Sequence, residues 1–208
     1  METSSVLLDR AIAALNKLPG IGRKTALRQA LFLLSQNKET VHDFCTALDE
    51  FRNHTLFCKI CHNISDTEIC SICSNPKRDV STVCVVGDIR DVMAIENTGT
   101  YFGVYHVLGG LISPMDGISP SQLNIEPLLD RVQNGNSVRE VIFAFPATPE
   151  GDTTAFYITR KLLSVTNEST ESVLITTIAK GISIGDELEY ADEITLGRSL
   201  ACRTEVKV

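Results

Sequence analysis

The chain has 208 residues, 43% of them hydrophobic, which is enough to build one substantial core and a small appended module without disulfide support. Its formal net charge of -7 argues against a protein that is basic over its whole surface. No apolar run approaches the ~20 residues that cross a bilayer, and the N-terminus lacks the pattern of a secretory signal. We therefore expect a cytoplasmic protein with no membrane partner.

Charge is distributed unevenly along the chain. Residues 1–80 contain 10 Lys or Arg and 9 Asp or Glu, whereas residues 81–208 contain 9 and 17. From Arg10 to Lys38 there are six basic residues and no acidic one. A polyanion is therefore expected to bind the N-terminal part of the chain and to avoid the acidic C-terminal part.

The first predicted elements are two helices joined by a glycine turn. Apolar residues recur at helical spacing ahead of that turn, at Leu7, Leu8, Ile12, Leu15 and Leu18. The pattern stops at Pro19-Gly20-Ile21-Gly22, and a second helix is predicted from Arg23 to Leu34. The two glycines allow a sharp turn, and Ile21 between them can anchor that turn in the core.

This glycine turn favours contact with a phosphate backbone. Amide groups at a helix N-terminus attract anions, and nearby cations add countercharge without reading base sequence. The alternative is an ordinary helical hairpin whose turn needs glycine, but the basic stretch without acids favours DNA. The segment resembles a helix-hairpin-helix motif, and its predicted DNA-binding residues are Gly20, Gly22, Arg23, Lys24, Thr25 and Arg28.

An amphipathic segment at 41–51 leads into four clustered cysteines, Cys58, Cys61, Cys70 and Cys73. They form two Cys-x-x-Cys pairs, and two such turns can close a tetrahedron of thiolates around Zn²⁺. The alternatives are a redox dithiol, which needs only one pair, and four unrelated buried thiols. Two equally spaced pairs favour one structural zinc ion per chain, with no ligand position left for a substrate.

The remaining cysteines are Cys45, Cys84 and Cys202. A reduced cytosolic protein with an odd number of thiols is a poor candidate for disulfides. These three are predicted to be buried as small hydrophobic side chains.

Beyond residue 80, short apolar runs alternate with helical patterns. Strands are predicted at 82–86, 138–145 and 173–179, and a helix is predicted after each, at 89–96, 153–163 and 188–200. A further helix is predicted at 121–132. This alternation indicates a mostly parallel sheet flanked by helices, so the fold class is α/β with small N-terminal modules.

The order of these modules resembles the RecR family of recombination-mediator proteins over essentially the whole chain. Four strings carry the resemblance: 105–110 (YHVLGG), 113–118 (SPMDGI), 150–154 (EGDTT) and 185–193 (GDELEYADE). The resemblance implies a helix-hairpin-helix region at 1–54, a four-cysteine zinc ribbon at 55–79 and a Toprim-like domain at 80–178. A C-terminal segment at 179–208 is expected to complete that domain and to make oligomer contacts.

In Toprim domains, by the same resemblance, a glutamate after the first strand joins later carboxylates around Mg²⁺. Here Gly87 stands at that position, followed by Asp88, and the later acids match Glu150 and Asp152. A Mg²⁺ site without the first carboxylate is in doubt, because a shift of one residue at a strand end redirects the side chain. The alternatives are solvated loop acids, an N-cap at Asp152, or carboxylates that face a protein partner.

The resemblance implies a DNA-binding adaptor that is not an enzyme. Such proteins form ring-shaped homo-oligomers, here a dimer or tetramer, and work with RecO, and in some bacteria RecF, to load recombinase near the nucleoid. The first rival is a Mg²⁺-dependent Toprim nuclease or primase-like enzyme. The second is a zinc-stabilised scaffold that binds DNA only weakly. ATP hydrolysis is not predicted, because residues 181–193 come without a phosphate-binding Gly-x-x-x-x-Gly-Lys loop.

Overall fold

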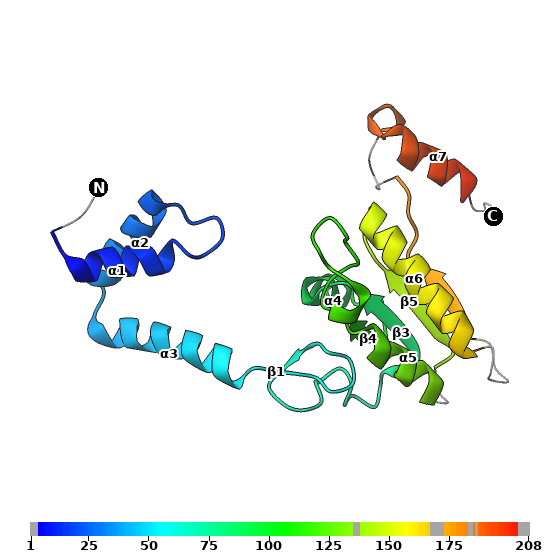
Figure 1. Cartoon of the computed structure of the whole chain (residues 1–208), viewed down its shortest axis with the longest axis horizontal. Coiled ribbons are helices and arrows are strands. Elements are labelled where there is room, and N and C mark those ends of the chain that lie inside the picture. The colour runs from blue at the N-terminus through cyan, green and yellow to red at the C-terminus, as the bar shows by residue number, and fades with distance from the viewer. Residues whose placement is uncertain (1–3, 135–137, 167–172, 183–184, 186, 204–208) are drawn as a thin grey trace. The chain divides into compact units, whose positions relative to one another are not determined.

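The computed structural model describes residues 4–134, 138–166, 173–182, 185 and 187–203 (Figure 1). It divides the chain into two compact units, Met1–Thr55 and Leu56–Val208. Within the predicted regions 1–54, 80–178 and 179–208, residues 1–3, 135–137, 167–172, 183, 184, 186 and 204–208 lie outside the described part. None of the described helices combines the length and apolarity that a bilayer-spanning helix needs.

The first unit is a group of three helices. They are α1 (Val6–Leu15), α2 (Arg23–Ser35) and α3 (Lys38–His54). Ile12 of α1 packs against Ala26 and Ala30 of α2, and Ile21 from the intervening turn joins this small core. The two alanines let the helices approach closely, so the predicted pair of helices with an anchored turn is confirmed.

The second unit begins with the cysteine segment. Its two short strands, β1 (Leu56–Phe57) and β2 (Ile64–Ser65), pair in antiparallel fashion. The apolar core of this segment consists of the cysteines themselves, with Ile72 packed against them. A segment with so little other buried apolar surface requires an additional source of stability.

The main sheet has four parallel strands in the order β4-β3-β5-β6. They are β3 (Asp79–Val86), β4 (Gly103–Val107), β5 (Glu140–Ala144) and β6 (Leu174–Thr177). β3 occupies an inner position, where Val85 lies opposite His106 of β4 and Phe143 of β5. This arrangement confirms the expected α/β class with a parallel sheet.

Successive residues of β3 point to opposite faces of the sheet, and both faces are covered. Val83 and Val85 belong to a core with α5 (Ile125–Asn134) and α6 (Pro149–Thr166). Cys84 and Val86 belong to a second core with α4 (Ile89–Glu96). An uninterrupted apolar run such as 83–86 is therefore what this strand needs.

Two segments that were predicted as single helices are each divided. A 3₁₀ turn, η1 (Pro120–Gln122), precedes α5, and another, η2 (Leu188–Tyr190), precedes α7 (Glu193–Ala201). In the second case Asp192 adopts an extended conformation, and its side chain accepts from the Thr195 backbone N–H at 2.9 Å. This N-cap starts a new helix, so the predicted continuity of 188–200 was wrong.

The prediction for the three scattered cysteines is correct for one of them. Cys84 is buried in β3, and burial raises the pKa of its thiol to about 12. Cys45 and Cys202 are exposed. The prediction was wrong for these two, because Cys45 lies on α3, a helix without buried residues, and Cys202 is the C-cap that follows α7.

Candidate metal centre and nucleic-acid interface

The turn between α1 and α2 has the backbone geometry of a sharp elbow. Gly20 has a positive φ of 77°, where a side chain is strained although space is available. Gly22 is extended and is the N-cap of α2, whose first intrahelical bond runs from the Ala26 N–H to the Gly22 carbonyl at 2.9 Å. Both glycines of the sequence motif are therefore accounted for by the turn.

The start of α2 has the features of an anion-binding end. Gly22 offers no capping side chain, and the first turn contains no acidic residue. Lys24 and Arg28 are exposed. The orphan amides and the positive end of the helix dipole are thus accompanied by cations, which is the arrangement that phosphate contact requires.

The sequence pattern missed one acidic residue that lies near this elbow. The acid-free stretch begins directly after Asp9, and the packing of α1 on α2 brings that carboxylate within 3.9 Å of the Arg23 guanidinium. The Arg23 side chain is 59% exposed, so the ion pair is worth ~1 kcal/mol at most. Arg23 therefore shares its charge with Asp9, and Lys24 and Arg28 are the stronger phosphate candidates.

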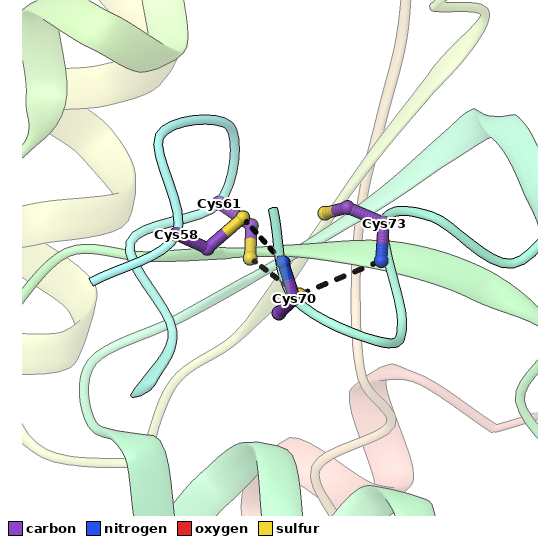
Figure 2. Close-up of side chains that lie close together, drawn as sticks. All are labelled: Cys58, Cys61, Cys70 and Cys73. Atoms are coloured by element: carbon purple, nitrogen blue, oxygen red, sulfur yellow. Dashed lines mark hydrogen bonds between the residues drawn. The ribbon is translucent and has the colours of Figure 1, made fainter. Parts of the chain in front are cut away.

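The four clustered cysteines converge on one point (Figure 2). Their sulfur atoms all lie within 4.8 Å of one another, and three of the residues are buried. Four Zn–S bonds of about 2.3 Å would give a tetrahedron with edges of about 3.8 Å. The donor set and its spacing fit zinc, whereas four unrelated buried thiols would not converge and a redox pair would need only two.

Backbone donors favour thiolates at this site. The Cys70 N–H lies 3.3 Å from the Cys58 Sγ, and the Cys73 N–H lies 3.5 Å from the Cys70 Sγ. Burial raises the pKa of Cys58, but hydrogen bonds from the amides of Cys70, Cys61 and Ile60 outweigh it and lower the pKa to about 6. Contact with Cys73 and burial raise the pKa of Cys61. A bound cation relieves this crowding of sulfurs, because it stabilises all four as thiolates.

The cysteine segment is docked on the edge of the main sheet at β4. The Val107 N–H donates to the Cys61 carbonyl at 2.8 Å, and Ile72 packs into the core shared by β3, β4 and α4. His62 packs edge-on against the buried His106, with ring centroids 5.3 Å apart. His62 is thus half-buried.

Asp88 is not directed into a carboxylate cluster. It is the N-cap of α4, accepting from the Arg90 N–H at 2.7 Å and pairing with the Arg90 side chain at 2.8 Å. At Gly87 a Cβ would lie 3.2 Å from the Leu111 side chain, and the adjoining cavity of about 510 Å³ is lined mainly by apolar residues. Among the described residues, the only cluster suited to a metal ion is the one formed by the cysteines.

Glu150 and Asp152 lie in the first turn of α6, not in a loop. Asp152 Oδ1 accepts from Lys180 Nζ at 2.5 Å, and Oδ2 accepts from Arg198 Nη2 at 3.0 Å. Lys180 follows β6, and Arg198 lies on α7. Asp152 therefore ties the C-terminal helix to the sheet, whereas within the described residues no ion pair engages the Glu150 side chain. The suggested N-cap role of Asp152 was wrong, because Asp152 lies within the helix.

Replacing Asp152 by asparagine is expected to loosen α7. Lys180, and then Arg198, hold the pKa of this carboxyl below its usual value against the effect of burial. The ionised Asp152 carboxylate therefore stabilises the folded state fully above its ordinary pKa of about 4. This stabilisation is lost as pH falls through the lower pKa that the carboxyl has in the folded protein. The Asp152 side chain is 42% exposed, so we expect ~1 kcal/mol or less.

Amide hydrogen exchange in 193–201 measures this effect. At neutral pH, Asp152→Asn should speed exchange there by up to about fivefold, and the difference from wild type should shrink as pH falls below the ordinary carboxyl pKa of about 4. Glu150→Gln, in the same turn, is the matched control and should leave α7 unchanged. Equal exchange in wild type and Asp152→Asn would show that α7 is held by other contacts.

The helical elbow, the four-cysteine cluster and the parallel sheet together define a zinc-finger protein with a helix-hairpin-helix and a Toprim domain. Family models agree with each part. The model described as RecR, helix-hairpin-helix matches residues 8–52, and the RecR four-cysteine zinc finger domain matches 56–75. The Toprim domain model matches 81–173, and RecR, C-terminal matches 181–203.

Curated relatives extend over nearly the full chain. A recombination protein RecR of Bacteroides thetaiotaomicron is 58% identical over 200 residues, covering 96% of this chain and 94% of the relative. Those of Porphyromonas gingivalis and Flavobacterium johnsoniae are 56% and 55% identical, covering 97% and 98% of this chain and 94% and 95% of the relatives. The chain belongs to the RecR family, and its four-cysteine finger is a structural zinc site.

Proposed function

We propose that this protein is a DNA-binding adaptor of recombinational repair, which holds the nucleic-acid backbone and recruits other proteins to it. The observation that carries the proposal is the exposed cationic elbow at the start of α2, with its glycine N-cap and the side chains of Lys24 and Arg28. These groups recognise phosphate without reading bases. We retain the predicted DNA-binding set, with the amides of the elbow and the side chains of Lys24 and Arg28 making the main contacts. That set is Gly20, Gly22, Arg23, Lys24, Thr25 and Arg28.

We further propose that Cys58, Cys61, Cys70 and Cys73 are the four zinc ligands and that zinc has a structural role. The convergence of all four sulfurs leaves no ligand position for a substrate. The docking of this segment on β4 makes the metal part of the second unit's architecture. The limits proposed for the four regions, 1–54, 55–79, 80–178 and 179–208, follow this division of roles.

The acidic C-terminal part is proposed to face proteins. Residues 81–208 carry 17 acidic and 9 basic residues, so this part repels DNA and attracts basic partners. RecO is the proposed partner, with RecF in some settings, and Glu150 is the favoured contact because Asp152 is engaged by Lys180 and Arg198. We also propose a ring-shaped homo-oligomer, a dimer or tetramer, acting beside the chromosome in the cytoplasm.

A nuclease or primase-like activity is the less favoured function. Asp88 caps α4, Asp152 is paired with two cations, and Gly87 supplies no carboxylate. Two-metal nucleotidyl chemistry needs several carboxylates directed at the same ions. The geometry of these three positions supports an adaptor more than it supports a Mg²⁺-dependent enzyme.

Incubating the full chain with gapped DNA and Mg²⁺ distinguishes the two functions. We expect a complex that dissociates as salt increases, because counterions are released when cations contact phosphates. The DNA should stay intact. Gel analysis of the DNA and a binding titration on the same samples provide both readouts. Metal-dependent cleavage that disappears in Asp152→Ala would establish the enzyme, and a complex too weak to detect even at low salt would favour a mere scaffold.

A further inference from the structure

Arg131 of α5 is a half-buried cation that the proposed function does not use. Its Nη1 donates to the Tyr105 carbonyl of β4 at 2.8 Å. Within the described part of the chain, no carboxylate lies within the 4.0 Å of an ion pair with this guanidinium. A positive charge removed from water without an anionic partner is destabilising, so its surroundings must supply negative charge in another form.

The electrostatic surroundings of Arg131 include the cysteines. Burial lowers the pKa of Arg131, whereas electrostatic interaction with Cys73, Cys61, Tyr101 and Cys58 raises it. The backbone brings these groups together. Arg131 is fixed to the carbonyl of Tyr105, and two residues along the same strand the Val107 N–H holds the Cys61 carbonyl at 2.8 Å.

Zinc bound by four thiolates leaves a net charge of about −2 on the site. Here that charge lies among buried residues, where low dielectric makes an uncompensated charge expensive. The amide donors to Cys58 and Cys70 offset part of it. A guanidinium held beside the site offsets a full unit, and outer groups of this kind tune the affinity of metal sites.

We propose that Arg131 is the counter-charge of the zinc thiolate centre and couples metal retention to the docking of the cysteine segment on the main sheet. The cation comes from a helix of the α/β domain, whereas the thiolates come from the preceding segment. Zinc loading fixes all four sulfurs as thiolates and so supplies the anion that Arg131 requires, whereas loss of zinc removes that fixed anion. This rests on the four-cysteine zinc site and is independent of whether DNA binds the elbow.

Measuring zinc release from the full chain into excess chelator, with a metallochromic indicator, tests the proposal. Arg131→Gln should release zinc about tenfold faster than wild type, the lower end of effects seen when outer partners of metal ligands are removed. Arg131→Lys keeps the charge and should stay close to wild type. Arg160→Gln removes an exposed arginine of α6 that contacts Phe156 and should have no effect.

Two further readouts separate counter-charge from simple loss of the Tyr105 hydrogen bond. The cobalt-substituted variants should keep the thiolate-to-metal absorption of four cysteines, which shows that no ligand was lost. The melting temperature of Arg131→Gln should fall more for zinc-loaded than for zinc-free protein.

Zinc release at the wild-type rate from Arg131→Gln, or equally fast release from Arg131→Lys, would overturn the proposal. If Arg131→Gln fails to fold, Arg131→Lys still tests the proposal. Zinc release near the wild-type rate supports a required positive charge, and release much faster than from wild type and Arg160→Gln overturns it. Wild-type protein isolated with well under one zinc per chain would instead refute the zinc site itself.

Discussion

Cys70→Ser is expected to abolish stoichiometric zinc binding. It should also destabilise the unit Leu56–Val208 by on the order of 5 kcal/mol, which is a part of the binding free energy that structural zinc contributes in small fingers. The cysteine segment has two strands of two residues each and a core made of the ligands themselves. Once the metal is lost, little else holds it. Metal analysis and melting curves with and without chelator measure the two effects.

Cys45→Ser is the matched control for that experiment. Cys45 is exposed on α3 in the other unit, so its replacement should change neither zinc content nor stability. Adding chelator to wild-type protein should reproduce the melting curve of Cys70→Ser and should have no further effect on the variant. A Cys70→Ser protein that keeps one zinc per chain would show that Cys70 is not a ligand.

Lys24→Ala combined with Arg28→Ala is expected to weaken DNA binding about tenfold to a hundredfold near 0.1 M salt, since each cation that contacts phosphate releases counterions. If each side chain neutralises one duplex phosphate, the slope of log affinity against log salt becomes shallower by about 1.8. Both side chains are exposed on the first turns of α2, so folding should be unaffected. Fluorescence anisotropy over a salt series measures affinity and slope together.

Lys38→Ala combined with Arg52→Ala removes the same charge from the same unit, at the two ends of α3. A general effect of net charge would shift both double variants alike. A specific elbow predicts a marked loss for Lys24 and Arg28 and a small one for the control. Indistinguishable salt slopes in the two variants would remove the elbow as the DNA site.

Local patterns predicted the elements whose causes lie close together in the chain. The glycine turn follows from a helical apolar pattern interrupted at Pro19–Gly22, and the structure confirms it with a positive φ at Gly20. The strand at 83–86 is a continuous apolar run because both of its faces are buried. The four cysteines were identifiable because tetrahedral coordination restricts their spacing.

Side-chain partners distant in the chain could not be predicted in this way. The ion pairs of Asp152 join residues 28 and 46 positions apart, and the hydrogen bond of Arg131 to Tyr105 spans 26 positions. Each depends on strand order and helix packing. For Asp88 a local signal existed. An aspartate followed three residues later by Asp91, ahead of an apolar helix, indicates a capping box, which would have argued against a metal ligand.

Hydrogen exchange of the full chain with and without gapped DNA tests most directly whether the cationic elbow receives the nucleic acid. The first amides of α2 have no intrahelical partners and should exchange fast in the free protein. DNA should slow exchange at 20–28 and leave exchange unchanged around Asp88 at the start of α4 and Glu150 in the first turn of α6. Protection around Asp88 and Glu150, with unaltered exchange at the elbow, would contradict the assignment of DNA to the N-terminal unit.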